Sequence, residues 1–338
     1  MQVVLILMGA LLISAAAAAG AGFPGAKDYV VNGCRVFSPD QMEIKALPGD
    51  RCVFLDKGSF VTTMSESIRY YTATNEMKWE IKGHFHHQLN LSHDRQRLLA
   101  IGSTKAAMNG ENEKRYDQLL VIGLSGKVLN SLDVNKAFEL MGIKSTNYPN
   151  PYQKLFPVEH EGSHINSFYE IGPLNNGARK PAYIREGHYI LNGIAQGVIF
   201  LDKDLKAIKH WVSPYSNRHN VHDAQITSGG RLIYFNNQHV TDNWKTQFST
   251  IDEIDLATSK LSLQIKANPA SLFFSRHSGG VQVLDRDLVL FSHAVSGYYV
   301  YSRRSKQIVY MSTAPYFTGS NYTFAQQVKV VDLTEFLK

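Results

Sequence analysis

Residues 219–237 have the sequence HNVHDAQITSGGRLIYFNN, and this stretch decides the fold. Apolar and polar residues alternate on both sides of Gly229-Gly230, which is typical of two half-buried strands joined by a tight turn. His219 and His222 lie where the first of these strands begins. The stretch therefore predicts a β-hairpin with histidines at its mouth.

Short strands separated by turns recur in blocks of four along most of the chain. The blocks begin at Arg51, His87, His164, His222 and His277. Blocks of this length are typical of propeller blades. Residues 29–36 and 42–45 at one end and 325–331 at the other are left over, and together they would complete a sixth blade. We therefore predict an all-β fold, a six-bladed β-propeller of four-stranded blades, with five or seven blades as alternatives.

One segment, residues 133–162, interrupts the strand pattern. Residues 134–141 have helical spacing of apolar side chains, and the prolines at 149 and 151 favour a turn. We predict an inserted helix and loop between two blades. Such a loop either shapes a binding site or is a surface excursion without a role.

The first residues predict export. An apolar run over 3–13 precedes a small-residue site at 19–21, which indicates a signal peptide over 1–21 and a single propeller domain over 22–338. An uncleaved anchor is the alternative, although the run is short for a membrane span. No lipid anchor or later membrane segment is expected, so we predict a periplasmic or secreted protein.

Cysteine content and charge restrict the classes of partner. Cys34 and Cys52 are the only cysteines, and export favours a disulfide between them; two free thiols or metal binding are the alternatives. The net charge of +6 would attract anionic ligands. The basic residues are scattered and no nucleic-acid motif is present, so nucleic acid is not expected as a partner. No phosphate-binding or dinucleotide motif indicates a cofactor.

Four histidines share one place in the repeat. The innermost strand of a blade lines the central channel, so residues at its start would gather at one mouth. The blocks give this position to His87, His164, His222 and His277. Histidine can act as base, acid, nucleophile or metal ligand near neutral pH. His219 and His222 have no third ligand nearby in sequence, so no metal site is predicted.

The order of these motifs resembles that of the bacterial arylsulfotransferase family. The matching stretches are His86-His87 with Ser92-His93-Asp94, His164-Ile165-Asn166-Ser167, His222-Asp223-Ala224-Gln225 with residues 230–237, and residues 280–284. The resemblance implies an exported six-bladed propeller that moves a sulfuryl group from a phenolic sulfate ester to a phenol. It also implies a sulfohistidine intermediate and no nucleotide sulfate donor.

By motif position, the resemblance assigns the nucleophile to His222. His164 and Asn166, two apart on a strand, would face the same way and hold sulfate oxygens, and His164 or His87 would protonate the departing phenolate. His277 would be a further substrate-binding residue.

The family's sulfate-binding arginine has no counterpart in the sequence. Residues 192–196, Asn-Gly-Ile-Ala-Gln, occupy its region. Its loss would remove a strong charge-assisted contact to the sulfuryl oxygens. Arg218 or Arg276 would have to replace it.

Two other functions fit the same sequence. A polysaccharide lyase would combine the histidines with Tyr169 or Tyr234 and act on an acidic polymer. A non-catalytic propeller would use the channel mouth to bind an anionic or aromatic ligand.

Overall fold

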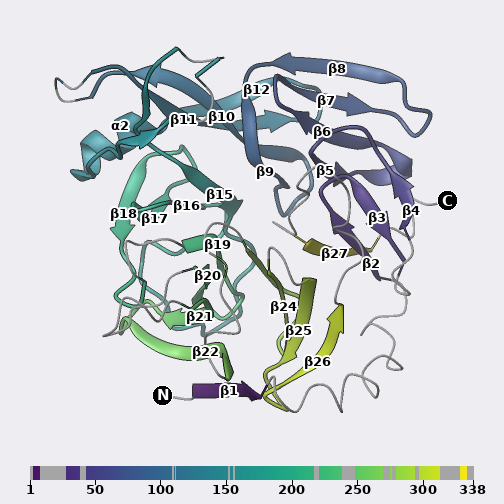
Figure 1. Cartoon of the computed structure of the whole chain (residues 1–338), viewed down its shortest axis with the longest axis vertical. Coiled ribbons are helices and arrows are strands. Elements are labelled where there is room, and N and C mark those ends of the chain that lie inside the picture. The colour runs from purple at the N-terminus through teal and green to yellow at the C-terminus, as the bar shows by residue number, and fades with distance from the viewer. Residues whose placement is uncertain are drawn as a thin grey trace. The chain divides into compact units, whose positions relative to one another are not determined.

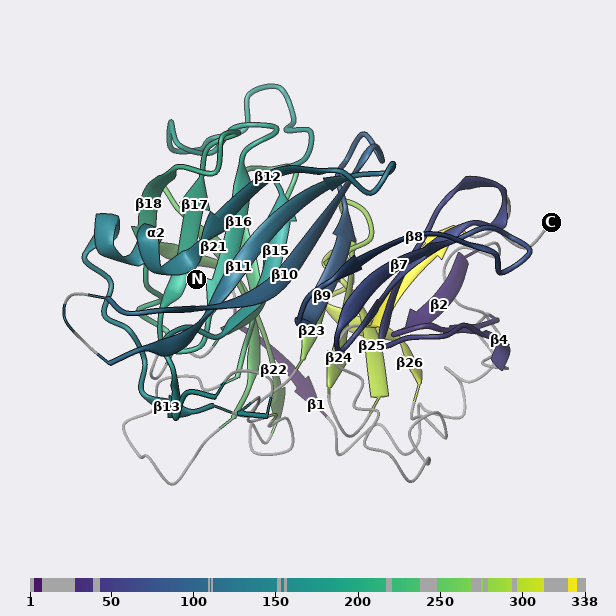
Figure 2. The same cartoon turned by 90° about the horizontal axis from the view of Figure 1, so that it is seen from above.

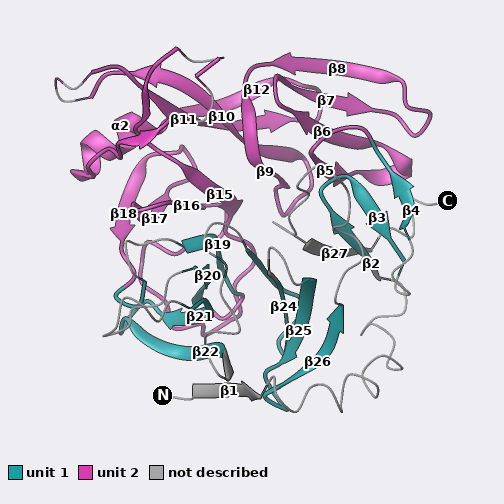
Figure 3. Cartoon of the chain, viewed as in Figure 1, with its two compact units in different colours: residues 1–47, 214–227, 231–337 teal, residues 48–213, 228–230, 338 magenta. Residues whose placement is uncertain are grey.

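The computed structural model describes residues 3–7, 28–38, 43–108, 110, 112–150, 153–154, 157–216, 221–237, 248–268, 275, 279–293, 297–312 and 328–332. Within these residues the strands form six sheets, each built on four antiparallel strands, and the fold is a six-bladed β-propeller (Figure 1). The prediction of the fold class is therefore confirmed. The chain divides into two compact units (Figure 3), each with three of the sheets.

The second unit contains residues 48–213 and 228–230 among those described. Its first sheet consists of β5 (Arg51–Phe54), β6 (Phe60–Met64), β7 (Ser67–Tyr71) and β8 (Met77–Lys82), with the 3-10 turn η1 (Asp56–Gly58) between the first two strands. Its second sheet consists of β9 (Phe85–Leu91), β10 (Arg97–Ala106), β11 (Lys114–Gly123) and β12 (Val128–Asp133), extended by β14 (His160–Glu161) and β13 (Tyr148–Pro149). Its third sheet consists of β15 (Ile165–Glu170), β16 (Tyr189–Gly193), β17 (Gly197–Leu201) and β18 (Ala207–Trp211).

The predicted helix is present as α2 (Val134–Met141). Val134, Ala137 and Phe138 repeat at helical spacing and are buried, and Gly142, with a φ of 64°, follows the last turn. The helix lies against β11 and β18, and the two views in Figures 1 and 2 agree on this. It therefore covers an edge between the second and third sheets of its own unit.

Apolar side chains between neighbouring sheets form the cores of the second unit. One core, which includes Leu99, Phe138 and Phe168, joins the second sheet, α2 and the third sheet. Another, which includes Val61 and Leu98, joins the first and second sheets. Full burial of side chains of this size stabilises the fold by roughly 1.5–3 kcal/mol each. These cores hold the inner strands β9 and β15 in fixed positions.

The first unit contains the other three sheets. One consists of β19 (Val221–Ile226), β20 (Leu232–Asn236), β21 (Thr250–Asp255) and β22 (Lys260–Asn268), with β1 (Val3–Leu7) parallel to β22. The next consists of β23 (Gly280–Val283), β24 (Leu288–His293), β25 (Gly297–Ser302) and β26 (Gln307–Ser312). The last consists of β27 (Val328–Asp332), β2 (Asp28–Asn32), β3 (Arg35–Phe37) and β4 (Glu43–Ala46).

The last of these sheets joins strands from both ends of the chain. β27 pairs antiparallel with β2, so residues 328–332 share a sheet with residues 28–46. This is the shared sixth blade predicted from the leftover strands. Cys34 and Cys52 form a disulfide, which confirms the predicted pairing.

Residues 8–27 lie outside the described part of the chain, as do residues 1 and 2, so the signal peptide stays a prediction. In the described part of the chain, no helix has the length and apolar character needed to cross a membrane.

Candidate active site

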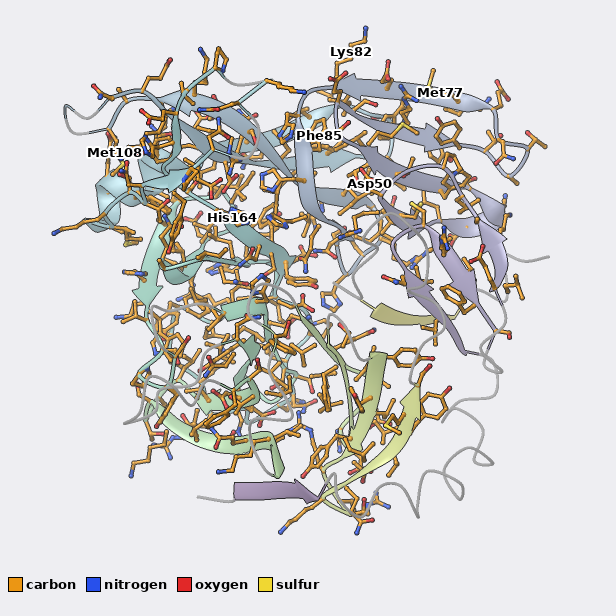
Figure 4. The ribbon with its side chains drawn as sticks, in the orientation of Figure 1. Asp50, Met77, Lys82, Phe85, Met108 and His164 are labelled. Carbon is orange, nitrogen blue, oxygen red and sulfur yellow. The ribbon has the colours of Figure 1, made fainter. Side chains whose placement is uncertain are left out.

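His87 and His164 face each other in the second unit. Their Nε2 atoms are 2.8 Å apart and their ring centroids 4.7 Å apart. His87 belongs to β9. His164, which is labelled in Figure 4, directly precedes β15. An imidazole nitrogen either donates or accepts, so a contact of this length between two Nε2 atoms places one proton between them. We call these two residues the histidine pair.

A bulge in β9 positions the first member of this pair. Opposite β9 the register shifts between Ala100 and Gly102, and His87 has a φ of 57°. A left-handed conformation at a residue with a side chain costs roughly 1–2 kcal/mol. The bulge interrupts the alternation of the strand, and the rings of His86 and His87 lie 4.6 Å apart. Strain of this kind is concentrated at functional sites.

Glu161 and Arg115 fix the second member of the pair. His164 Nδ1 lies 2.8 Å from Glu161 Oε1, and Arg115 Nη2 donates to Glu161 Oε2 at 2.5 Å. A carboxylate paired with a guanidinium is ionised and can only accept hydrogen bonds. Nδ1 of His164 therefore carries a proton, and in the neutral ring Nε2 carries the lone pair that faces His87.

Asp117 on β11 bonds to His86, the neighbour of His87 in the chain. His86 Nε2 donates to Asp117 Oδ1 at 2.8 Å, and Arg115 Nη1 donates to the same oxygen at 2.8 Å. Asp117 Oδ2 accepts from the backbone N–H of Ile165 at 2.6 Å. Asp117 therefore joins the bulge of β9 to the start of β15, the two places where the histidine pair is attached.

Burial and charge set the ionisation of this network. Burial alone would raise the pKa of Asp117, but the charge of Arg115 and the hydrogen bond from His86 outweigh it and hold the pKa well below its usual range. Burial lowers the pKa of His86, and the neighbouring Asp117 opposes this only in part. Asp117 is therefore ionised and His86 neutral near pH 7.

His84 adds a further neutral imidazole beside the network. Burial is the main cause that lowers its pKa to about 4, and the charges of His86 and Arg115 act in the same direction. Ser103 Oγ accepts from Arg115 Nη1 at 2.8 Å and lies 3.0 Å from His84 Nδ1. Ser103 therefore links His84 to Arg115 through its hydroxyl group.

His222, the predicted nucleophile, lies on β19 in the first unit and is buried. Its Nδ1 is 2.6 Å from Asn237 Oδ1, and Asn237 Nδ2 donates to the carbonyl oxygen of Ser275 at 2.8 Å. That second bond fixes the orientation of the amide, so its oxygen faces the imidazole. His222 therefore carries its proton on Nδ1 and its lone pair on Nε2.

A bulge with a left-handed residue occurs in both β9 and β19. In β19 it follows His222, and Asp223 has a φ of 55°, as His87 has 57° in β9. The two bulges differ in size, since partners two residues apart on the neighbouring strand face Phe85 and Leu89 in β9 but His222 and Gln225 in β19. The equivalence of His87 and His222 in the repeat therefore stays a prediction.

Asn166 is buried at a third irregularity. The register of β15 shifts between Ile165 and Ser167, so Asn166 is the extra residue. The alternation from which we expected His164 and Asn166 to share a face is interrupted here. The stretch over residues 192–196, where the sequence resemblance would place an arginine, ends in the turn between β16 and β17, and residues 193 and 197 pair across this turn. Gln196 donates from Nε2 to the carbonyl oxygen of Gly162 at 2.9 Å.

Several predicted residues lie outside the described part of the chain. They are Arg218, His219, Arg276 and His277. Their proposed roles in binding stay predictions. Of the tyrosines named for a lyase, Tyr169 accepts from Gln88 at 3.0 Å, and Tyr234 is fully buried.

Arg115, Asp117 and Glu161 were missed in the sequence. Arg115 and Asp117 lie among the first residues of β11, which begins at Lys114 and lacks apolar alternation there. The signal was the presence of three charged residues among the four over 114–117, with Glu161 three residues before His164. Among the described residues, no group of three or more His, Cys, Asp or Glu side chains has the arrangement of a metal site.

Comparison with known proteins supports the fold alone. No protein-family model and no curated protein matches the chain. The crystal structure of a protein of unknown function from Bacteroides caccae superposes with a TM-score of 0.55 at 9% identity, covering 90% of this chain and 99% of that one. The WD40 domain of Neurospora crassa Pan2 superposes with a TM-score of 0.49 at 11% identity, covering 87% of this chain and 78% of that one.

Proposed function

We propose that this protein is an exported enzyme of the arylsulfotransferase type, which moves a sulfuryl group from a phenolic sulfate ester to a phenol. The observation that supports this most is the 2.8 Å contact between the Nε2 atoms of His87 and His164. Both halves of such a reaction need a group that gives and takes back one proton. Histidine has this capacity because its neutral ring and its imidazolium form exchange a proton near neutral pH.

The tautomer of His222 supports its role as the nucleophile. Attack on sulfur needs an unprotonated ring nitrogen, and the bond from Nδ1 to Asn237 leaves the lone pair on Nε2. In the first half-reaction, a bond forms between this nitrogen and sulfur while the bond between sulfur and the phenolic oxygen breaks. The phenolate leaves and takes up a proton.

The second half-reaction restores the enzyme. The acceptor phenol loses its proton as its oxygen attacks sulfur, and the nitrogen–sulfur bond breaks. His222 recovers its lone pair, and the proton that the acceptor releases balances the proton that the first phenolate took up. No nucleotide and no metal takes part in this scheme.

Export is the proposed cellular setting. The disulfide between Cys34 and Cys52 is stable in an oxidising compartment and rare in a reducing one. We propose a periplasmic or secreted location, reached through the signal peptide predicted over residues 1–21.

Turnover of an aromatic sulfate ester with a phenol as acceptor tests the proposal. The mature protein should release the donor phenol and form the acceptor's sulfate ester, and His164→Gln should reduce the rate by about 10²–10⁴. His160→Gln is the matched control, since the side chain of this histidine is 30% exposed and lies 3.7 Å from the carboxylate of Glu159. Absence of transfer across a panel of donors and acceptors would refute the proposal.

The other functions give different results in the same experiment. Binding of an aryl sulfate without turnover would favour a non-catalytic propeller. An unsaturated product that absorbs in the ultraviolet, formed from a uronic polymer, would favour a lyase.

A further inference from the structure

The two members of the histidine pair are each attached to their own carboxylate. His164 bonds directly to Glu161 at 2.8 Å. His87 is attached through its neighbour His86, which bonds to Asp117 at 2.8 Å. The two attachments come from different strands, β14 and β11.

A single guanidinium connects the two carboxylates. Arg115 donates to Asp117 Oδ1 at 2.8 Å and to Glu161 Oε2 at 2.5 Å, and it is fully buried. Nη2 of Arg115 also donates to the carbonyl oxygen of Ser163, the residue before His164, at 3.2 Å. A buried charge is stable only where such partners surround it.

The charges of the two carboxylates determine which ring nitrogens of the histidine pair carry protons. Two ionised carboxylates around one guanidinium leave a net negative charge in a buried place. A carboxylate in that state cannot donate, so the nitrogen of His164 that faces it must be protonated. The hydrogen bond within the pair then runs from His87 Nε2–H to His164 Nε2 when both rings are neutral.

We propose that Arg115, Glu161 and Asp117 are positioning residues that set the tautomer of His164 and the spacing of the histidine pair. The inference rests on the proposed role of this pair in proton transfer. Glu161 fixes which nitrogen of His164 receives the proton. Asp117 fixes the bulge that carries His87, and Arg115 holds both carboxylates at once.

A purely structural ion network would behave differently on substitution. In Glu161→Gln, Arg115 still donates to the amide oxygen, so the amide NH₂ group turns toward His164. Nδ1 of His164 must then accept, and its proton moves to Nε2, where it opposes the N–H of His87. An isosteric change thus inverts the tautomer, whereas loss of stability alone would not.

The first measurement uses the intact protein. Long-range nitrogen–proton NMR spectra of protein labelled with ¹⁵N in histidine show which ring nitrogen carries the proton, and the signals of His164 are assigned by their loss in His164→Gln. We expect a protonated Nδ1 near pH 7.5. An unprotonated Nδ1 in the intact protein would overturn the proposal whatever the variants do.

The second measurement compares Glu161→Gln with Glu170→Gln. Glu170 is a suitable control because its side chain is buried and accepts from Arg97 at 2.8 Å. Within the described part of the chain, its hydrogen bonds and ion pairs do not include His87 or His164. Glu161→Gln should show a protonated Nε2 on His164 and a fall in kcat of about 10²–10⁴, with KM changed less. Glu170→Gln should retain both the tautomer and the rate.

The two proposals fail in different ways. If the intact protein transfers no sulfuryl group, the proposed function fails, and the tautomer still tests the positioning role. If transfer occurs but Glu161→Gln keeps a protonated Nδ1 and the full rate, the positioning role is wrong while the proposed function stands.

Discussion

His84 should make the stability of this protein depend on pH in a defined window. The ring is buried, and burial lowers its pKa from 6.5 to about 4. The unfolded chain therefore binds a proton near pH 6.5, whereas the folded protein binds it only near pH 4. Because the unfolded state binds the proton more readily, the free energy of unfolding falls as the pH decreases from about 6.5 to about 4.

The size of this effect follows from the two pKa values. The difference of about 2.5 units is equivalent to about 3 kcal/mol, and about 2.5 kcal/mol of it is lost by pH 4.5. Asp117 acts in the same direction at lower pH, since its pKa is held below its usual range. Measurements down to pH 4.5 therefore separate the contribution of His84 from that of Asp117.

Urea unfolding at pH 7.5 and at pH 4.5 measures the effect. His84→Gln removes the titrating ring but keeps a group that can bond to Ser103. We expect the free energy of unfolding of the variant to change between the two pH values by about 2.5 kcal/mol less than that of the natural protein. His160→Gln, which changes a partly exposed histidine, should behave as the natural protein does. Equal pH dependence in His84→Gln and the natural protein would refute this explanation.

Three further predictions concern stability. Gly162→Ala would place a methyl group in the buried ring of Tyr116, so we expect a loss of roughly 1–3 kcal/mol in urea unfolding; an unchanged midpoint would contradict this packing. Both His87→Gly and His87→Ala lack the ring, but the left-handed backbone favours glycine, so the glycine variant should be the more stable by about 1 kcal/mol. Equal stability of the glycine and alanine variants would argue against strain in this bulge. Cys52→Ser removes the disulfide and should lower the free energy of unfolding by roughly 2–4 kcal/mol. An unchanged free energy of unfolding after reduction of the natural protein would contradict this prediction.

The sheets could be predicted because each strand alternates apolar and polar residues and ends at a turn. The hairpin predicted over residues 219–237 is present as β19 and β20. The ends of β10 and β11 could not be predicted in this way. Residues 103–106 and 114–117 are rich in polar and charged side chains, and they pair with each other without the apolar alternation that marks the other strands.

The histidines of the site could be found from the repeat, but their support could not. Arg115 is fully buried only because two carboxylates, one of them more than forty residues later in the chain at 161, surround it. No local pattern specifies such an arrangement. The bulges at His87 and Asp223 have a similar origin, because a left-handed residue other than glycine gives no signal in the sequence.

The most direct measurement is the mass of the protein after brief exposure to an aryl sulfate donor without acceptor. Digestion and mass analysis under alkaline conditions preserve a nitrogen–sulfur bond. We predict that the peptide containing His222 gains the mass of one SO₃ group and loses it when a phenol is added. Release of the donor phenol with no such gain on any histidine would contradict a sulfohistidine intermediate.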